Sequence, residues 1–219
     1  MNIFDIVGPV MIGPSSSHTA GAARIGLVAR KLLGEPVAEA DIFFHGSFLS
    51  TGKGHGTDRA VVAGLLGYEV CDERIPDSFK YADEAGMRYS INGKDLGDVH
   101  PNSVKLIVKG SSGKTVELRA ASIGGGRIEV RELDGIGACF SAEQPTIIIH
   151  NVDKPGLVTE VTYLLSQKGI NIATMQLYRR KRGGEAVIVM ECDQEISASA
   201  IDELKAVPDI IKVSYLSLE

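Results

Sequence analysis

The chain has 219 residues, enough for one large domain or two small ones. Apolar residues make up 44% and charged residues 23%, as is usual for a soluble globular protein. The formal net charge of −5 argues against a nucleic-acid-binding protein, because such proteins usually carry a basic stripe. Cys71, Cys139 and Cys192 are far apart and form no CxxC pair, which favours a reducing compartment over a disulfide framework.

The N-terminal segment has an apolar start but no basic leader, and Gly8, Pro9, Gly13 and Pro14 interrupt it, so a signal peptide is not predicted. A membrane span needs a run of about 18 apolar residues, and no such run occurs. We therefore expect a soluble cytoplasmic protein that does not enter a membrane.

The first part of the chain, residues 1–139, is predicted to be a mixed α/β domain with a β-meander. Of the 25 glycines, 21 precede Pro145, and this indicates many tight loops. Apolar spacing and capping residues predict a helix at Ser17–Leu33, a strand at Asp41–Gly46 and a helix from Thr57 or Asp58 to Leu66. A further helix is predicted at Asp77–Gly86, and the meander at Val104–Leu133.

The second part, residues 145–219, shows a regular succession of elements. A strand at Thr146–His150 precedes a helix that begins near Pro155 and ends at Gly169. The remaining elements are two strands joined by the turn RRKRGG, a helix and a final strand, at Ile170–Tyr178, Ala186–Cys192, Ser197–Val207 and Ile210–Leu218. The order βαββαβ predicts a ferredoxin-like domain, and the whole chain is therefore assigned to the α+β class.

The motif GPSSSHT places hydroxyl groups and a histidine before the first predicted helix. The first N–H groups of a helix lack partners, so this position suits a carboxylate or a phosphate. The candidate ligand-binding side chains are Ser15, Ser16, Ser17, His18 and Thr19. The alternative is an ordinary capped helix, although one cap residue would suffice for that.

The motif GSFLSTGKGHGTDRA, residues 46–60, fits neither common phosphate-binding loop, because Gly54 follows Lys53 and the glycines are spaced GxGxG. Glycines on both sides of His55 allow a small ligand to approach closely, and histidine can accept a proton near neutral pH. The alternative is a flexible loop followed by a helix that Asp58 caps.

Other polar residues give weaker signals. Pro101 restricts the backbone and could orient His100 and Asn102 toward a ligand, although such a segment is more often a plain turn. The histidines show no metal-ligand spacing, so no metal site is predicted in this chain. The basic run at residues 179–182 is interpreted as an exposed hairpin turn.

The pairing of GPSSSHT with GSFLSTGKGHGTDRA resembles the β chain of two-subunit iron–sulfur L-serine dehydratases. The stretch VDKPGLVTEVTYLLSQKGINIATM looks like an ACT domain, a regulatory module. By this resemblance Asp153, Pro155, Gly156 and Asn171 are the expected effector-binding residues. A four-stranded sheet with both helices on one face leaves the other face and an edge uncovered, so at least a homodimer is expected through the ACT domain.

The resemblance implies a lyase of amino-acid degradation and gluconeogenesis that converts L-serine to pyruvate and ammonia. The family's 4Fe–4S cluster is held by cysteines of an α subunit, and an iron without a protein ligand acts as Lewis acid toward the substrate. This chain would be active only in a heteromer with that α subunit. Within it His55 would be the base, His18 a second catalytic residue, and Asp58 would bind the ammonium or orient His55. The remaining substrate-binding residues would be Ser15, Ser16, Ser17, Thr19, His100 and Asn102.

A second hypothesis belongs to another class. A ligand-binding domain followed by an ACT domain also resembles the regulatory tail of some 3-phosphoglycerate dehydrogenases. In that case the chain is a non-catalytic module that senses serine or another anion.

Overall fold

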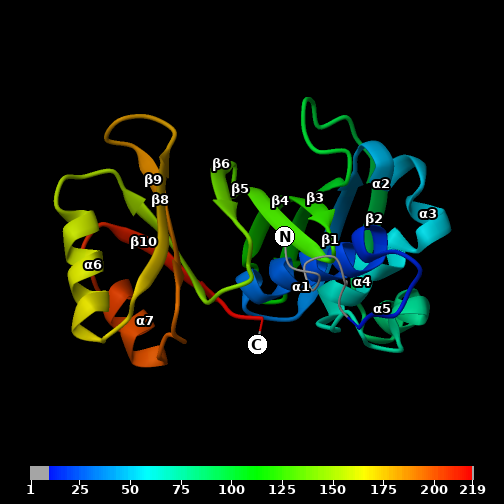
Figure 1. The fold of residues 1–219 in the computed structure, drawn as a ribbon, viewed down its shortest axis with the longest axis horizontal. Coiled ribbons are helices and arrows are strands. Elements are labelled where there is room, and N and C mark those ends of the chain that lie inside the picture. The colour runs from blue at the N-terminus through cyan, green and yellow to red at the C-terminus, as the bar shows by residue number, and fades with distance from the viewer. Residues whose placement is uncertain (1–9, 219) are drawn as a thin grey trace. The chain divides into compact units, whose positions relative to one another are not determined.

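The computed structural model describes residues 10–218, so the first nine residues of the predicted N-terminal domain lie outside the described part. The chain divides into two compact units, residues 1–134 and 135–219 (Figure 1). Among residues 10–218, none of the helices combines the length and the apolar character that a membrane crossing requires.

In the first unit, helices and strands alternate before a run of strands. The helical elements are the π-helix η2 (Ser16–Gly21), α1 (Ala22–Leu33), α2 (Gly46–Ser50), α3 (Gly52–His55), α4 (Thr57–Leu66), the 3₁₀ turn η3 (Ile75–Asp77) and α5 (Ser78–Glu84). The strands are β1 (Val37–Phe44), β2 (Arg88–Gly93), β3 (Ser103–Gly110), β4 (Thr115–Gly124) and β5 (Arg127–Leu133). They lie in the order β2-β1-β3-β4-β5. β1 and β2 are parallel, and the other neighbouring pairs are antiparallel.

Helices α1 and α4 cross closely because glycines face each other. A Cβ atom at Gly64 would lie 2.0 Å from the Ala23 carbonyl oxygen, and one at Gly26 would lie 2.3 Å from the Val61 carbonyl oxygen. Thr19, just before α1, bonds to His55, just before α4. Arg30 bonds to the Leu65 carbonyl near the C-terminal ends of both helices, so the two helices run in the same direction. Their N-terminal ends therefore lie together, and these ends carry the two motifs that the sequence singles out.

Most predicted elements of this unit are confirmed, and the differences concentrate around the motifs. The predicted helix at Ser17–Leu33 is present, but its first turn is π-helical. The segment after Gly46, interpreted as a possible loop, contains the short helices α2 and α3. The prediction of Thr57 or Asp58 as the helix cap is wrong, because the cap residue is Gly56, at φ 67°, and makes no side-chain cap bond. Strand β2, which pairs with β1, was not predicted.

The second unit contains the predicted βαββαβ succession. The unit begins with a separate strand, β6 (Ile136–Phe140). The succession itself consists of β7 (Thr146–Val152), α6 (Leu157–Gln167), β8 (Ile172–Arg179), β9 (Glu185–Cys192), α7 (Ala198–Lys205) and β10 (Ile210–Leu216). The sheet order is β10-β7-β9-β8, with every neighbouring pair antiparallel. Both helices lie on one face of this sheet (Figure 1) and pack on apolar side chains of β7 and β9. The ferredoxin-like arrangement and the hairpin turn after β8 are confirmed.

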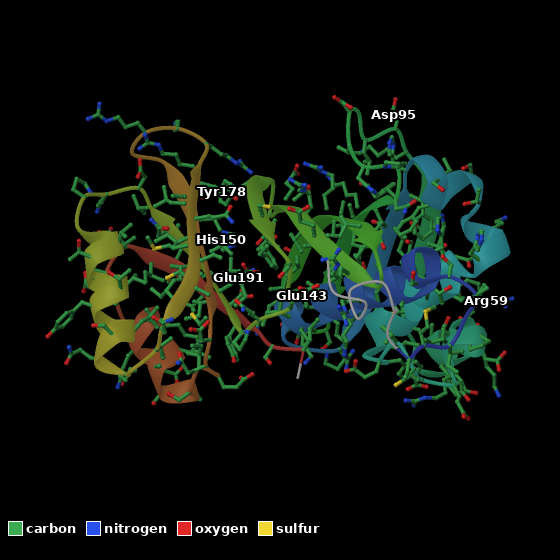
Figure 2. The ribbon with its side chains drawn as sticks, viewed as in Figure 1. Arg59, Asp95, Glu143, His150, Tyr178 and Glu191 are labelled. Carbon is green, nitrogen blue, oxygen red and sulfur yellow. The ribbon has the colours of Figure 1, made fainter. Side chains whose placement is uncertain are left out.

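A buried carboxylate ties the segment before β7 to this sheet. Glu191 on β9, 9% exposed, accepts hydrogen bonds from the Ser141 backbone N–H at 3.0 Å and hydroxyl at 2.9 Å (Figure 2). Its second oxygen accepts from the Thr174 hydroxyl at 2.8 Å. Partners on both oxygens compensate the cost of burying the charge.

Candidate functional site

The GPSSSHT motif forms a capped π-helical turn. Ser15 has an extended backbone, and its Oγ accepts a hydrogen bond from the His18 backbone N–H at 3.1 Å. The N–H of Ala20 donates to the Ser15 carbonyl at 3.3 Å, the five-residue spacing of a π-turn. Such turns are rare and frequently occur at functional sites. The Ser15 hydroxyl therefore serves as the helix cap, the simpler of the two interpretations for that residue.

His18 is held by two hydroxyl groups that the sequence analysis did not include. Its Nε2 lies 3.1 Å from Ser47 Oγ and 3.1 Å from Thr51 Oγ1. The two hydroxyl oxygens are 3.3 Å apart. Ser47 and Thr51 are four residues apart, so one short helix presents both on the same side. This spacing in GSFLST was the signal available, and it required recognition of α2 as a helix.

His55 is the last residue of α3, and its ring is oriented by the backbone. Its Nδ1 lies 3.0 Å from the carbonyl oxygen of Thr51. A carbonyl oxygen can only accept, so Nδ1 donates its hydrogen and the neutral ring keeps a lone pair on Nε2. The Thr19 hydroxyl donates to the His55 carbonyl at 3.0 Å and so links the two motifs across 36 residues. In the neutral imidazole, Nε2 is therefore the nitrogen that can accept a proton.

The two histidines lie against each other. Their ring centroids are 4.9 Å apart, and the Phe48 ring meets His18 edge-on at 5.3 Å. Burial, followed by the charge of His55, lowers the pKa of His18, and a hydrogen bond from the His18 ring to the Ser47 backbone carbonyl opposes the shift. Burial, the largest cause, therefore favours the neutral form of the His18 ring.

A pocket of about 230 Å³ opens beside His55. Its wall combines backbone of the two motifs with a few apolar and cationic side chains: Ile12, Gly13, Pro14, Thr19, Lys53, Gly54, His55, Gly56, Arg59, Ile75 and Pro76. The glycines leave backbone exposed to a ligand, as expected for a site that a small molecule approaches closely. Lys53 and Arg59 were not among the sequence candidates.

Several of the other sequence candidates in this unit are not part of the wall of this pocket. Ser15, Ser16, Ser17 and Asp58 do not line it. Asp58 lies in the first turn of α4, where its Oδ1 accepts from the Arg59 backbone N–H at 2.8 Å.

The segment that contains His100 and Asn102 serves a different part of the unit. His100 lines a separate hollow together with Asp98, Val99, Ser103, Arg119, Ala121 and Arg131. Its Nδ1 accepts from the Asn102 backbone N–H at 3.1 Å. The Pro101 carbonyl accepts from the Ser47 N–H at 2.8 Å, so this segment supports the start of α2. The structure does not bring His100 to the pocket beside His55, contrary to the expectation of one shared pocket.

The expected effector-binding residues of the second unit are divided between its two ends. Asp153 accepts from the Gly183 N–H at 3.0 Å and from Arg179 Nη1 at 2.9 Å, and both bonds lower its pKa. Gly156, at φ 93°, caps α6 one residue after the exposed Pro155. Asn171 lies before β8, where its side chain donates to Asp193. Since β7 and β8 both run antiparallel to β9, the end of β7 and the start of β8 lie at opposite ends of the sheet.

The cysteines do not form a ligand set for an iron–sulfur cluster. In residues 10–218, no group of three or more His, Cys, Asp or Glu side chains is placed to hold a metal ion. Cys71 is exposed, Cys139 is half-buried, and burial raises the pKa of the buried Cys192 to about 11. Cluster ligation uses thiolates from several neighbouring cysteines, so the described residues do not fit this cofactor.

Comparison with known proteins matches both units. The family model described as serine dehydratase beta chain matches residues 2–94, and that of the ACT domain matches residues 145–209. The probable L-serine dehydratase beta chain of Bacillus subtilis is 43% identical, over 99% of this chain and 98% of its own length. The L-serine dehydratase beta chain of Peptoniphilus asaccharolyticus is 36% identical, over 98% of this chain and 97% of its own. The D-3-phosphoglycerate dehydrogenase of Bacillus subtilis is 27% identical over 90% of this chain, which spans 37% of that enzyme.

Proposed function

Because this chain belongs to the L-serine dehydratase β-chain family, we propose that it is the β subunit of an enzyme that converts L-serine to pyruvate and ammonia. The match extends over nearly the whole length of both β chains, which supports the catalytic hypothesis more strongly than the sensor hypothesis. The dehydrogenase that represents the sensor hypothesis is less similar, and only about a third of its length is matched.

The observation that carries the proposal is the orientation of His55 beside the glycine-rich pocket. Dehydration of serine requires removal of the α-proton and departure of the β-hydroxyl. With Nδ1 donating to Thr51, His55 Nε2 holds the lone pair that takes up the α-proton. Loss of the hydroxyl as water then leaves an enamine, which tautomerises to an imine and is hydrolysed to pyruvate and ammonia. His18, whose neutral form burial favours, lies next to this base and is held there by the hydroxyl groups of Ser47 and Thr51.

The chain contributes one part of the enzyme in this proposal. A 4Fe–4S cluster, with cysteine ligands from an α subunit, would supply the Lewis acid that this chain does not provide. The two relatives are each named a beta chain, which supports the existence of a partner subunit. The reaction would belong to amino-acid degradation and gluconeogenesis in the cytoplasm.

The ACT unit would regulate the enzyme as a homodimer. β8 is an edge strand of its sheet, and an unpaired strand edge is available for a second chain. Met175 and Leu177, two positions apart on this strand, are 46% and 44% exposed, and they give the open edge an apolar contact surface. An effector would bind at that interface, where a second chain could bring Asn171 near the Asp153 turn of the first.

Co-expression with a cysteine-bearing α subunit tests the division of labour. Purified under anaerobic conditions, the complex is expected to form pyruvate from L-serine and to show iron–sulfur absorbance. The isolated chain is expected to be folded, colourless and inactive. Iron–sulfur absorbance in the isolated chain would contradict the assignment of the cluster to the α subunit, and an inactive complex with intact cluster would favour the sensor hypothesis.

A further inference from the structure

The pocket beside His55 contains two cationic side chains and no acidic one. Lys53, on α3, and Arg59, on α4, line it from either side of the Gly56 bend. The rest of the wall is apolar or backbone, apart from Thr19 and His55. The electrostatic character of the pocket is therefore positive.

Neither cation has an ion-pair partner in the part of the chain that the structure describes. Among residues 10–218, no carboxylate forms an ion pair with Lys53 or Arg59. Other arginines of the same unit behave differently, since Arg74 pairs with Asp72 and Arg119 with Glu132. The guanidinium of Arg59 (labelled in Figure 2) has an aromatic neighbour instead, because its central carbon lies 6.0 Å from the Phe79 ring centroid.

The position of Arg59 opposes the local electrostatics of the helix. It lies in the first turn of α4, where the helix dipole favours anions and disfavours cations. The backbone at this point is fixed, because the Ser78 hydroxyl donates to the Arg59 carbonyl at 2.7 Å. A cation held at such a place, beside a pocket and with no carboxylate paired to it among residues 10–218, indicates an anionic ligand.

The hydroxyl groups expected to hold that anion are already used or lie elsewhere. Ser15 Oγ accepts the His18 N–H, and the Thr19 hydroxyl donates to the His55 carbonyl. Ser16 and Ser17 do not line the pocket. The cations are thus the strongest donors that face a ligand beside His55.

We propose that Arg59, assisted by Lys53, binds the α-carboxylate of the amino-acid substrate and thereby selects for free amino acids. The planar guanidinium matches a carboxylate with two parallel hydrogen bonds, while the ammonium of Lys53 adds a point charge. The volume of about 230 Å³ is below the range of about 300–1,000 Å³ for drug-sized ligands and suits a small amino acid. A carboxylate held here places the substrate α-carbon next to His55. This inference rests on the proposed function.

The αβ complex tests the inference through the substrate carboxylate. The variants are Arg59→Met, Arg59→Lys and Lys53→Met, and Lys109→Met removes a cation of β3 outside the pocket as the control. For Arg59→Met, KM for L-serine is expected to rise about 10- to 100-fold, as for loss of a charge-assisted hydrogen bond, with a smaller change in kcat. The preference for L-serine over L-serinamide should fall by a similar factor, because the amide lacks the charge. Arg59→Lys should recover only part of the loss, and Lys109→Met should match the wild type.

A binding measurement on the isolated full chain separates this inference from the proposed function. L-Serine is expected to shift the ring signals of His55 in NMR spectra, whereas L-serinamide is not, and Arg59→Met should abolish the shift. If these shifts occur while the wild-type complex forms no pyruvate, the proposed function fails and the carboxylate site stands. If the complex is active but Arg59→Met retains the wild-type KM and selectivity, the carboxylate is bound elsewhere and the inference is wrong.

Discussion

Replacing Gly64 by alanine is expected to destabilise the first unit by about 1–2 kcal/mol. The added Cβ would lie 2.0 Å from the Ala23 carbonyl oxygen, whereas ordinary contact begins near 3.4 Å, so the two helices must separate by roughly 1.4 Å. Overpacking of this kind costs about 1–3 kcal/mol. The 2.0 Å approach to a backbone oxygen places the cost in the upper half of this range, about 2–3 kcal/mol. Alanine recovers about 0.5–1 kcal/mol through its better helix propensity, which leaves a net loss of about 1–2 kcal/mol.

Amide hydrogen exchange in α1 and α4 measures this effect within the first unit alone. A loss of about 1–2 kcal/mol corresponds to roughly 5- to 30-fold less protection. Gly54→Ala is the matched control, since a Cβ at that α3 position meets no atom within 4 Å. It should leave protection unchanged or increase it. Equal or greater protection in Gly64→Ala would refute the conclusion that glycine is required for the helix crossing.

Three further predictions concern the site and the ACT unit. His55→Asn in the αβ complex should lower kcat for L-serine at least about a hundredfold while cluster content persists, and near-normal kcat would place the base elsewhere. Burial and His55 lower the pKa of His18, so the unfolded chain binds the proton more readily. The stability from this group is therefore present above the unfolded pKa of about 6.5 and lost as the pH falls toward the folded pKa. Urea midpoints measured at decreasing pH should show a fall that His18→Asn reduces, and an identical pH profile in the variant would contradict the assignment. Met175→Lys combined with Leu177→Lys should weaken self-association of the full chain in light scattering, and a monomeric wild type at high concentration would argue against a β8 interface.

The sequence by itself determined the elements whose residues interact locally. Apolar spacing at Leu157, Val161 and Leu165 specified α6, and alternating β-branched runs specified the strands of the ferredoxin-like unit, because one face of each element must be buried. The same holds for the β3-β4-β5 meander, where short turns join consecutive antiparallel strands. The motifs around His18 and His55 were also recognisable, since their polar and glycine residues exceed what a capped helix or a turn needs.

The tertiary structure decided which of these residues meet. The close crossing of α1 and α4 depends on Gly26 and Gly64, and at the N-terminal ends of these helices His18 meets His55 and the α2 hydroxyl groups. Contacts between residues distant in sequence leave no local periodicity, so neither the α2 and α3 helices nor the basic lining of the pocket could be predicted. For the same reason the sequence could not show that His100 lies in a separate hollow, or that Asn171 lies at the far end of the sheet from Asp153. Sequence motifs had grouped each of these residues with the other candidates.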